Sequence, residues 1–199
     1  MDFTPEALGL DPIIASRMVA IIIADGFNLT EYESAKGALS AAGAFVFTIG
    51  PKRQPVIPSG GGNGVAPDHH FEGMRSTMFD SLHIPGGDHG STLLKQGRVI
   101  HWVKEAYGHC KAIGATGDGV KLVEKACGIE GMMFSTNEEV VDSYGVVTAA
   151  GLGHGTRSVK EGLNMIRGAK DFLSAYAWNI SQHKNWQREL DGLVELVAY

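Results

Sequence analysis

The stretch MVAIIIADGFNLTEYESAKGALSAAGAFVFTI, residues 18–49, decides the fold. It begins and ends with continuous apolar runs that are typical of strands. Between them, Asn28 is a good helix N-cap, Glu31 is placed to complete a capping box, and Gly43 marks the end of an Ala-rich helix. Strands that are apolar on both sides need helices on both faces of their sheet. This βαβ unit therefore predicts a doubly wound, mostly parallel α/β sheet.

The rest of the chain repeats this alternation of short apolar strands and helical patterns. Residues 50–67 contain four prolines and five glycines, which predicts a loop with a short edge strand at 55–58. The predicted strands are 81–84, 111–115 and 145–149, and the predicted helices are a long one through 93–103, then 120–126, 159–177 and a last one from 184.

Composition and charge exclude several classes of protein. The 199 residues carry 17 Lys+Arg against 22 Asp+Glu, a net charge of −5, so no basic footprint for nucleic acid is present. The longest apolar run, 18–24, is about a third of the ~20 residues that a membrane helix needs. We therefore expect one domain at 17–199, preceded by a linker or docking arm at 1–16, with neither nucleic acid nor membrane as a partner.

The cysteines, the histidines and the N-terminus give no sign of a metal site or a secretory signal. Cys110 and Cys127 form no C-x-x-C pair, and the adjacent His69 and His70 would point apart in an extended segment. We expect two reduced core thiols and no metal. The opening MDFTPEALGLD lacks the cationic and apolar regions of a secretory signal, so localisation stays unknown, with the cytoplasm as the default expectation.

Chemistry in such a sheet is expected at the carboxyl ends of the strands, in the loops 25–31, 85–91 and 116–119. Small residues surround Thr116, as they do in a strand-to-helix elbow. The backbone amides of Gly86, Gly87 and Gly117 could form an anion site beside it. A tight turn with a purely structural role is the alternative.

Two glycine-rich segments approach phosphate-binding motifs without completing them. Residues 114–119 have the glycine spacing of a P-loop but lack its Lys and Ser/Thr, and residues 151–155 lack the last glycine of a dinucleotide motif. A nucleotide site is therefore not expected. Flavin binding remains a minor alternative.

From Arg17 to Ala177 the chain resembles the PfpI-type, class I glutamine amidotransferase-like superfamily, which implies a flavodoxin-like fold. The matching pieces are the loop 25–27, Glu31, the segment 80–87, the elbow at Thr116 and the turn 151–156. The resemblance implies a cysteine at the elbow, a glutamate touching it and a histidine beyond it. Thr116 takes the cysteine's place and residues 120–144 contain no histidine, so only Glu31 carries over and the nucleophile elbow is degenerate.

Within that superfamily the pattern is most similar to the C-terminal domain of large-subunit catalases. The resemblance implies a parent that disproportionates hydrogen peroxide with a haem held in a domain outside this chain. The domain itself would have no cofactor and no catalytic residue. It would stabilise or help to oligomerise the parent, and it would act as an ATP-independent chaperone for unfolded clients.

Two other hypotheses stay open. One is a hydrolase or glyoxalase-like enzyme that uses Thr116 with Glu31, or with His89 or His154 if either reaches the pocket. The other is a small-anion or flavin module. In every case we expect Glu31 and Thr116 in hydrogen-bond contact, with Thr116 in a strained backbone conformation. A chaperone would also need exposed apolar surface, for which the candidates are 50–67, 74–79, 132–134 and 3–10.

Overall fold

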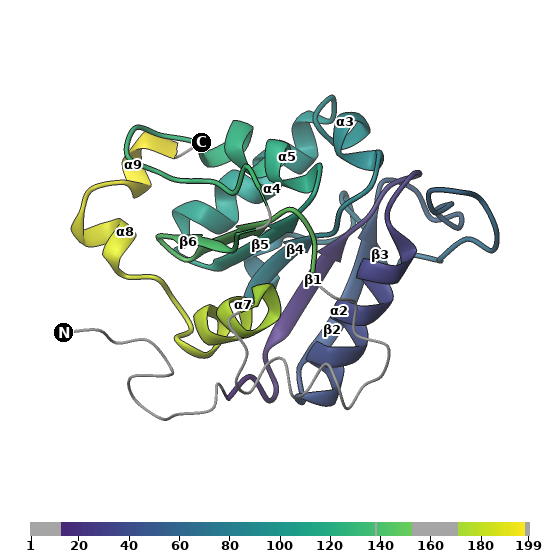
Figure 1. The fold of residues 1–199 in the computed structure, drawn as a ribbon, viewed down its shortest axis with the longest axis horizontal. Helices are drawn as coiled ribbons and strands as arrows, with labels where there is room; N and C mark the ends of the chain where they lie inside the picture. Colours follow the sequence, from purple (N-terminus) through teal and green to yellow (C-terminus); the bar gives the residue numbers. More distant parts are fainter. Residues whose placement is uncertain (1–12, 138, 153–170, 198–199) are drawn as a thin grey trace.

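The computed structural model describes residues 13–137, 139–152 and 171–197. Its centre is a seven-stranded sheet in the order β3-β2-β1-β4-β5-β7-β6, in which only the β6–β7 pair is antiparallel (Figure 1). The predicted doubly wound, mostly parallel, flavodoxin-like sheet is confirmed. The strands are β1 (Met18–Ile22), β2 (Phe45–Gly50), β3 (His69–His70), β4 (Ser81–Ile84), β5 (Ala112–Thr116), β6 (Val141–Ser143) and β7 (Val146–Ala149).

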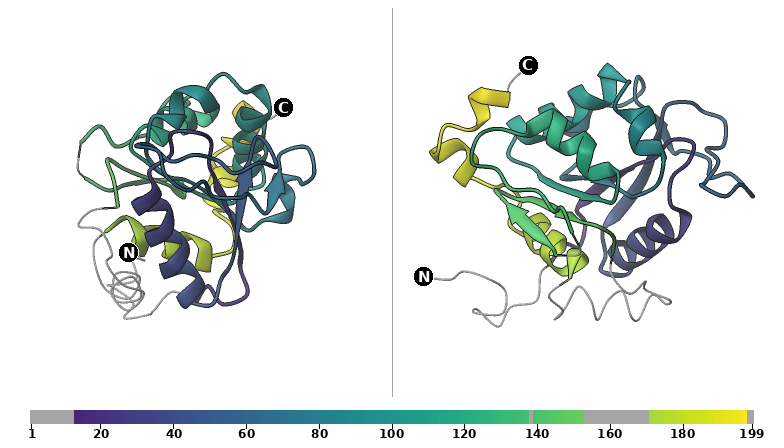
Figure 2. Two further views of the ribbon diagram at one scale, coloured as in Figure 1. Left: turned by 90° about the vertical axis from the view of Figure 1, so that its right-hand side faces the viewer. Right: turned by 45° about the horizontal axis from the view of Figure 1, so that its top comes forward.

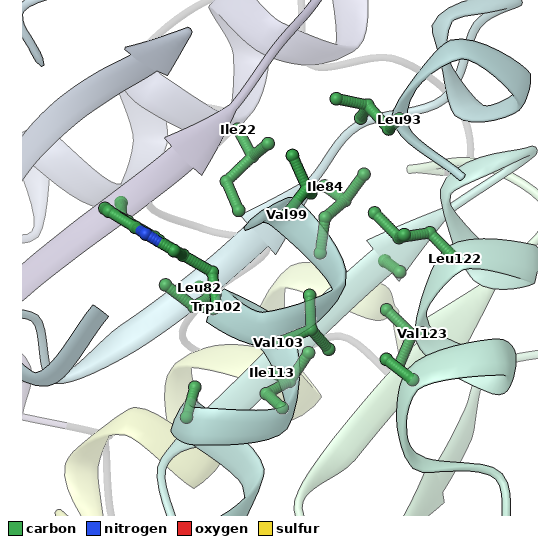
Figure 3. Packing of buried hydrophobic residues seen from close by; sticks show 14 of the residues in the cluster. Ile22, Leu82, Ile84, Leu93, Val99, Trp102, Val103, Ile113, Leu122 and Val123 are labelled. Atoms are coloured by element: carbon green, nitrogen blue, oxygen red, sulfur yellow. The ribbon is translucent and has the colours of Figure 1, made fainter. Parts of the chain in front are cut away.

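Helices cover both faces of this sheet (Figure 2). They are α2 (Leu29–Ala41), α3 (His89–Leu93), α4 (Gly97–Gly108), α5 (Gly119–Cys127), α7 (Phe172–Ser181), α8 (Gln187–Leu190) and α9 (Val194–Val197), with a 3-10 turn η1 at Ser76–Met78. One buried cluster joins the sheet to α3, α4 and α5, and Figure 3 shows its centre around Trp102. The other cluster joins the opposite face to α2 and α7. Two buried faces explain why the strands are apolar throughout.

The first βαβ unit forms as the sequence predicts, except for the capping box, because the Asn28 N–H donates to the Gly86 carbonyl and not to the Glu31 side chain. The Asn28 side chain accepts a hydrogen bond from the Glu31 backbone N–H and caps α2. The helix ends at Ala41, and Gly43 follows with a φ of 92°, a value that favours glycine. Both local signals therefore set the helix boundaries.

Several predicted boundaries are wrong. The edge strand next to β2 is β3 at 69–70 rather than 55–58, where Val56 and Pro58 make isolated bridges to Val65 and Phe27. The helical pattern through 93–103 is divided between α3 and α4. Strand β6 was not predicted, and the tail after 184 forms two short helices.

At its described end the predicted helix 159–177 is helical from Phe172, but the helix runs on to Ser181. Asp171 is extended, and its carboxylate accepts the Ser174 N–H as the N-cap of α7. The earlier part of the predicted helix, and residues 1–12 of the predicted arm, lie outside the described residues. At the described end of the arm Ile14 is buried, and the Ser16 N–H donates to the Gly43 carbonyl.

Candidate functional site: a closed elbow

The site lies at the carboxyl edge of the sheet, where β1, β4 and β5 end. Glu31 projects from the first turn of α2, and Thr116 is the buried last residue of β5. The Thr116 hydroxyl donates to Glu31 Oε2 at 2.5 Å. Residues 85 positions apart in the sequence therefore meet, as the resemblance implied.

The hydrogen bonds of this pair form a closed network. The Gly86 N–H donates to Glu31 Oε2 and to Thr116 Oγ1, both at 3.0 Å, and Asn28 Nδ2 lies 3.4 Å from Glu31 Oε1. Each carboxylate oxygen thus has a protein donor, and the hydroxyl both donates and accepts. A substrate would have to displace contacts that the protein makes with itself.

Close packing reinforces this network. A Cβ atom added to Gly86 would lie 3.1 Å from Glu31 Oε2, and one added to Gly151 would lie 3.2 Å from Glu31 Oε1. These glycines let the backbone approach the carboxylate closely. Backbone from two loops therefore packs against the carboxylate of Glu31, a residue that is partly buried.

The sharp turn of the elbow falls one residue later than expected. Thr116 is still part of β5, and the positive φ, 51°, belongs to Gly117. The expectation that Thr116 is strained is wrong. In a nucleophile elbow the reactive residue occupies the strained turn position. In this chain that position is held by Gly117, which has no side chain that could react. The glycine directly after Thr116 was the available sequence signal, since glycine adopts positive φ at least cost.

The three amides considered for anion binding do not form a free set of donors. The Gly86 N–H is used by Glu31 and Thr116, and the Gly117 N–H donates to the Ala149 carbonyl at 3.0 Å. Gly87, with a φ of 117°, packs against the backbone of the loop after β1. The Glu31 carboxylate beside Gly86 would also repel an anion.

His89 is not part of the pocket chemistry. Its Nδ1 accepts the Ala24 N–H at 3.1 Å, so its Nε2 is the protonated nitrogen that donates to the Pro85 carbonyl at 2.7 Å. Burial lowers the pKa of His89, which keeps the ring neutral. The ring connects the loops after β1 and β4 and supports Glu31 and Thr116 indirectly. His154, the other candidate, lies outside the described residues.

The two cysteines are buried free thiols in this fold. Burial raises the pKa of Cys127 to about 12 and also raises that of Cys110, so neither is a ready thiolate. Within the described ranges, no group of three His, Cys, Asp or Glu side chains could hold a metal ion, and no helix is long and apolar enough to cross a membrane.

Sequence reasoning missed His83, which lies fully buried in β4 between the sheet and α7. Its Nδ1 lies 3.3 Å from the Gly114 carbonyl, and its ring packs on Phe172 and Tyr176. Its Nε2 has no hydrogen-bond partner among the described residues. Burial lowers the pKa of His83 to about 4. The only sign in the sequence that His83 would be buried was its position in the short apolar run 81–84.

Comparison with known proteins places this geometry in context. Residues 17–162 match the family model described as DJ-1/PfpI family. Catalase A of Emericella nidulans is 45% identical over 205 residues, covering 100% of this chain and 27% of that protein. Catalase-1 of Neurospora crassa is 47% identical over 189 residues, covering 94% of this chain and 25% of that protein. The chain thus spans about a quarter of the length of these relatives.

Solved structures share the fold. Oxidised DJ-1 of Toxoplasma gondii aligns with a TM-score of 0.66 at 18% identity, covering 88% of this chain and 98% of that one. A ThiJ/PfpI domain protein of Brachyspira murdochii aligns with a TM-score of 0.66 at 17% identity, covering 84% of this chain and 98% of that one. At these identities the likeness concerns the fold alone.

Proposed function

The chain belongs to the DJ-1/PfpI family, and from this premise we propose that it is a non-catalytic C-terminal domain of a large-subunit catalase that stabilises the enzyme to which it is joined. Its likeness to two fungal catalases over a quarter of their length supports this proposal. The observation that carries the non-catalytic part is the closed network around Glu31, beside an elbow whose strained position is Gly117.

The proposal divides the roles within the parent protein. Hydrogen peroxide disproportionation and haem belong to the part of the parent outside this chain, and we assign no cofactor to this domain. The parent catalase domain is the first partner. A domain without its own chemistry contributes through contacts, by favouring the folded and assembled parent.

Replacing Glu31 tests the structural role of the network. We expect Glu31→Ala to lower the free energy of unfolding by about 1–3 kcal/mol, because the Thr116 hydroxyl loses its acceptor and the Gly86 N–H loses one of its two acceptors. Urea denaturation measures this change. Glu33→Ala is the matched control, since Glu33 is an exposed residue of the same helix, and it should change the stability much less.

The same variants decide between this proposal and an enzyme. A hydrolase or glyoxalase-like activity would use Thr116 with Glu31. We expect ester hydrolysis and methylglyoxal consumption at background rates in the unmodified chain and in both variants. A turnover that disappears in Glu31→Ala or Thr116→Ala but persists in Glu33→Ala would establish the enzyme instead.

A second proposed role, ATP-independent holding of unfolded proteins, is favoured by exposed apolar side chains in three of the candidate segments. Ile57, Met78 and Met133 are 41%, 55% and 63% exposed in segments 50–67, 74–79 and 132–134. Methionine adapts to many partners because its side chain is flexible. The segment 3–10 lies outside the described residues.

Heating an unrelated client enzyme with this chain, without ATP, tests the holding role. We expect light scattering to fall more than with the same mass of an inert protein, because exposed apolar groups of the client are covered. Met78→Ser combined with Met133→Ser should weaken the protection. Scattering that is unchanged at every ratio would leave stabilisation of the parent as the only role.

A further inference from the structure

The amino edge of the sheet, opposite the elbow, carries a cationic cavity. It has a volume of about 370 Å³ and lies between the segment before β4, the end of α4 and the segment after α7. Both exposed and partly buried polar groups face it. Its lining includes Met78, Asp80, His109, Lys111, His183 and Lys184.

The carboxylate of this cavity is already engaged. Asp80 Oδ2 accepts the Met18 N–H at 2.7 Å, and Asp80 Oδ1 lies 3.7 Å from Arg17 and 3.6 Å from His183. Glu105, the other carboxylate acting on Lys111, receives a hydrogen bond from Ser76. Both carboxylates that act on Lys111 thus have other partners, and the lining itself holds two lysines against one carboxylate, Asp80.

The two lysines are held in place by different contacts. Lys111 donates to the carbonyls of Ser76, at 3.4 Å, of Thr77, at 2.7 Å, and of Phe79, so its three ammonium donors are used within the chain and it offers the cavity only its positive charge. Lys184 lies over the ring of Trp186, 5.0 Å from its centroid. The chain as a whole has a net charge of −5, so a locally cationic cavity differs from the charge of the whole molecule.

His183 occupies a backbone position that favours glycine. Its φ is 68°, directly after the C-cap of α7. There its Nδ1 lies 2.8 Å from Arg17 Nη1. A non-glycine residue in this conformation carries backbone strain, and the Arg17 contact gives its side chain a specific role at the rim of the cavity.

Large apolar side chains adjoin the charged groups. Met78 and Trp186 are 55% and 54% exposed. Exposed Trp and Met side chains beside an Arg are typical of protein interfaces.

We propose that this amino-edge surface, made of the cavity with Arg17 and Trp186, binds an acidic polypeptide segment. Carboxylates of the segment pair with Lys184 and are attracted by the charge of Lys111, and its apolar side chains pack on Met78 and Trp186. Charge complementarity selects such a partner. The inference goes beyond the proposed function, since it assigns a binding surface at the edge that the family's elbow does not occupy.

Fluorescence anisotropy with a labelled peptide of alternating Glu and Leu tests the proposal on the whole chain. We expect saturable binding that weakens with salt, and no binding of the Lys-Leu counterpart. Lys184→Glu should weaken binding about tenfold or more, because it places like charges together. Met78→Ser should weaken it as well. Lys95→Glu is the control, an exposed lysine between α3 and α4 that makes the same change of charge outside this surface.

The unfolding midpoint of each variant verifies that it folds. Absence of peptide binding, or equal weakening by Lys95→Glu and Lys184→Glu, would overturn the proposal. Displacement of the peptide by inorganic phosphate, with equal binding of a Glu-Ser peptide, would replace a polypeptide surface by a simple anion site and would overturn it too. Loss of this binding leaves the stabilising role untouched, so the two proposals fail separately.

Discussion

Arg188→Ala should lower the free energy of unfolding by about 3–5 kcal/mol, since three backbone carbonyls lose a charged donor and a large buried side chain leaves a cavity. Arg188 is fully buried although it belongs to the short helix α8. Its Nε donates to the Tyr144 carbonyl at 2.6 Å, and its Nη1 donates to those of Tyr107 and Lys111 at 3.1 and 2.9 Å. The guanidinium carbon lies 4.3 Å from the centroid of the Tyr107 ring.

The expected loss of stability is large because the Arg188 side chain joins the C-terminal segment to the ends of three elements. A matched control is Arg98→Ala, because the Arg98–Glu72 pair is exposed, with side chains 51% and 60% accessible, and such pairs contribute about 0–1 kcal/mol. Urea denaturation of both variants gives the comparison. Equal losses for the two arginines would show that the tail does not depend on Arg188.

His83 should make the domain sensitive to acid. The pKa of His83 is lowered from 6.5 to about 4 by burial. Between these values the unfolded chain binds a proton that the folded chain does not, so the free energy of unfolding falls as the pH falls from 6.5 to 4. At about 1.4 kcal/mol per pH unit, the contribution of His83 to this loss is about 3 kcal/mol.

Two carboxyl groups oppose this trend. Burial raises the pKa of Asp171 to about 6 and also raises that of Asp142, so both favour the folded state as the pH falls. The contribution of His83 is therefore measured as a difference between the unmodified chain and His83→Phe. We expect the variant to gain about 3 kcal/mol relative to the unmodified chain between pH 6.5 and 4. His101→Phe, at an exposed histidine, should give no such gain, and parallel pH curves for His83→Phe would refute the assignment.

The sequence predicted the parts of the fold that depend on local patterns. Apolar runs identified β1, β2, β4, β5 and β7, and Asn28 with Gly43 marked the ends of α2. Strand β6 escaped because it has only three residues and forms by antiparallel pairing with β7. The N-cap of α7 at Asp171 was missed because that residue lies inside the periodic pattern from which the helix was predicted.

The site was also predicted only in part, because some of its features depend on backbone angles and on partners that are distant in the sequence. The contact between Glu31 and Thr116 was expected from the resemblance to the PfpI-type superfamily, and the structure has that contact. The one-residue shift of the turn to Gly117 depends on a backbone angle that composition does not reveal. The roles of His89 and Arg188 depend on partners 65 and 44 to 81 positions away, which no local pattern identifies.

We propose that this domain stabilises a catalase without taking part in its chemistry. Heat inactivation of the parent catalase, measured with and without the residues of this domain, is the decisive test of this stabilising role. We expect an unchanged kcat/KM for hydrogen peroxide at room temperature and a clearly faster loss of activity on heating, because the contacts of the domain are lost. An equal rate of heat inactivation, or a fall in kcat/KM at full haem occupancy, would contradict this account.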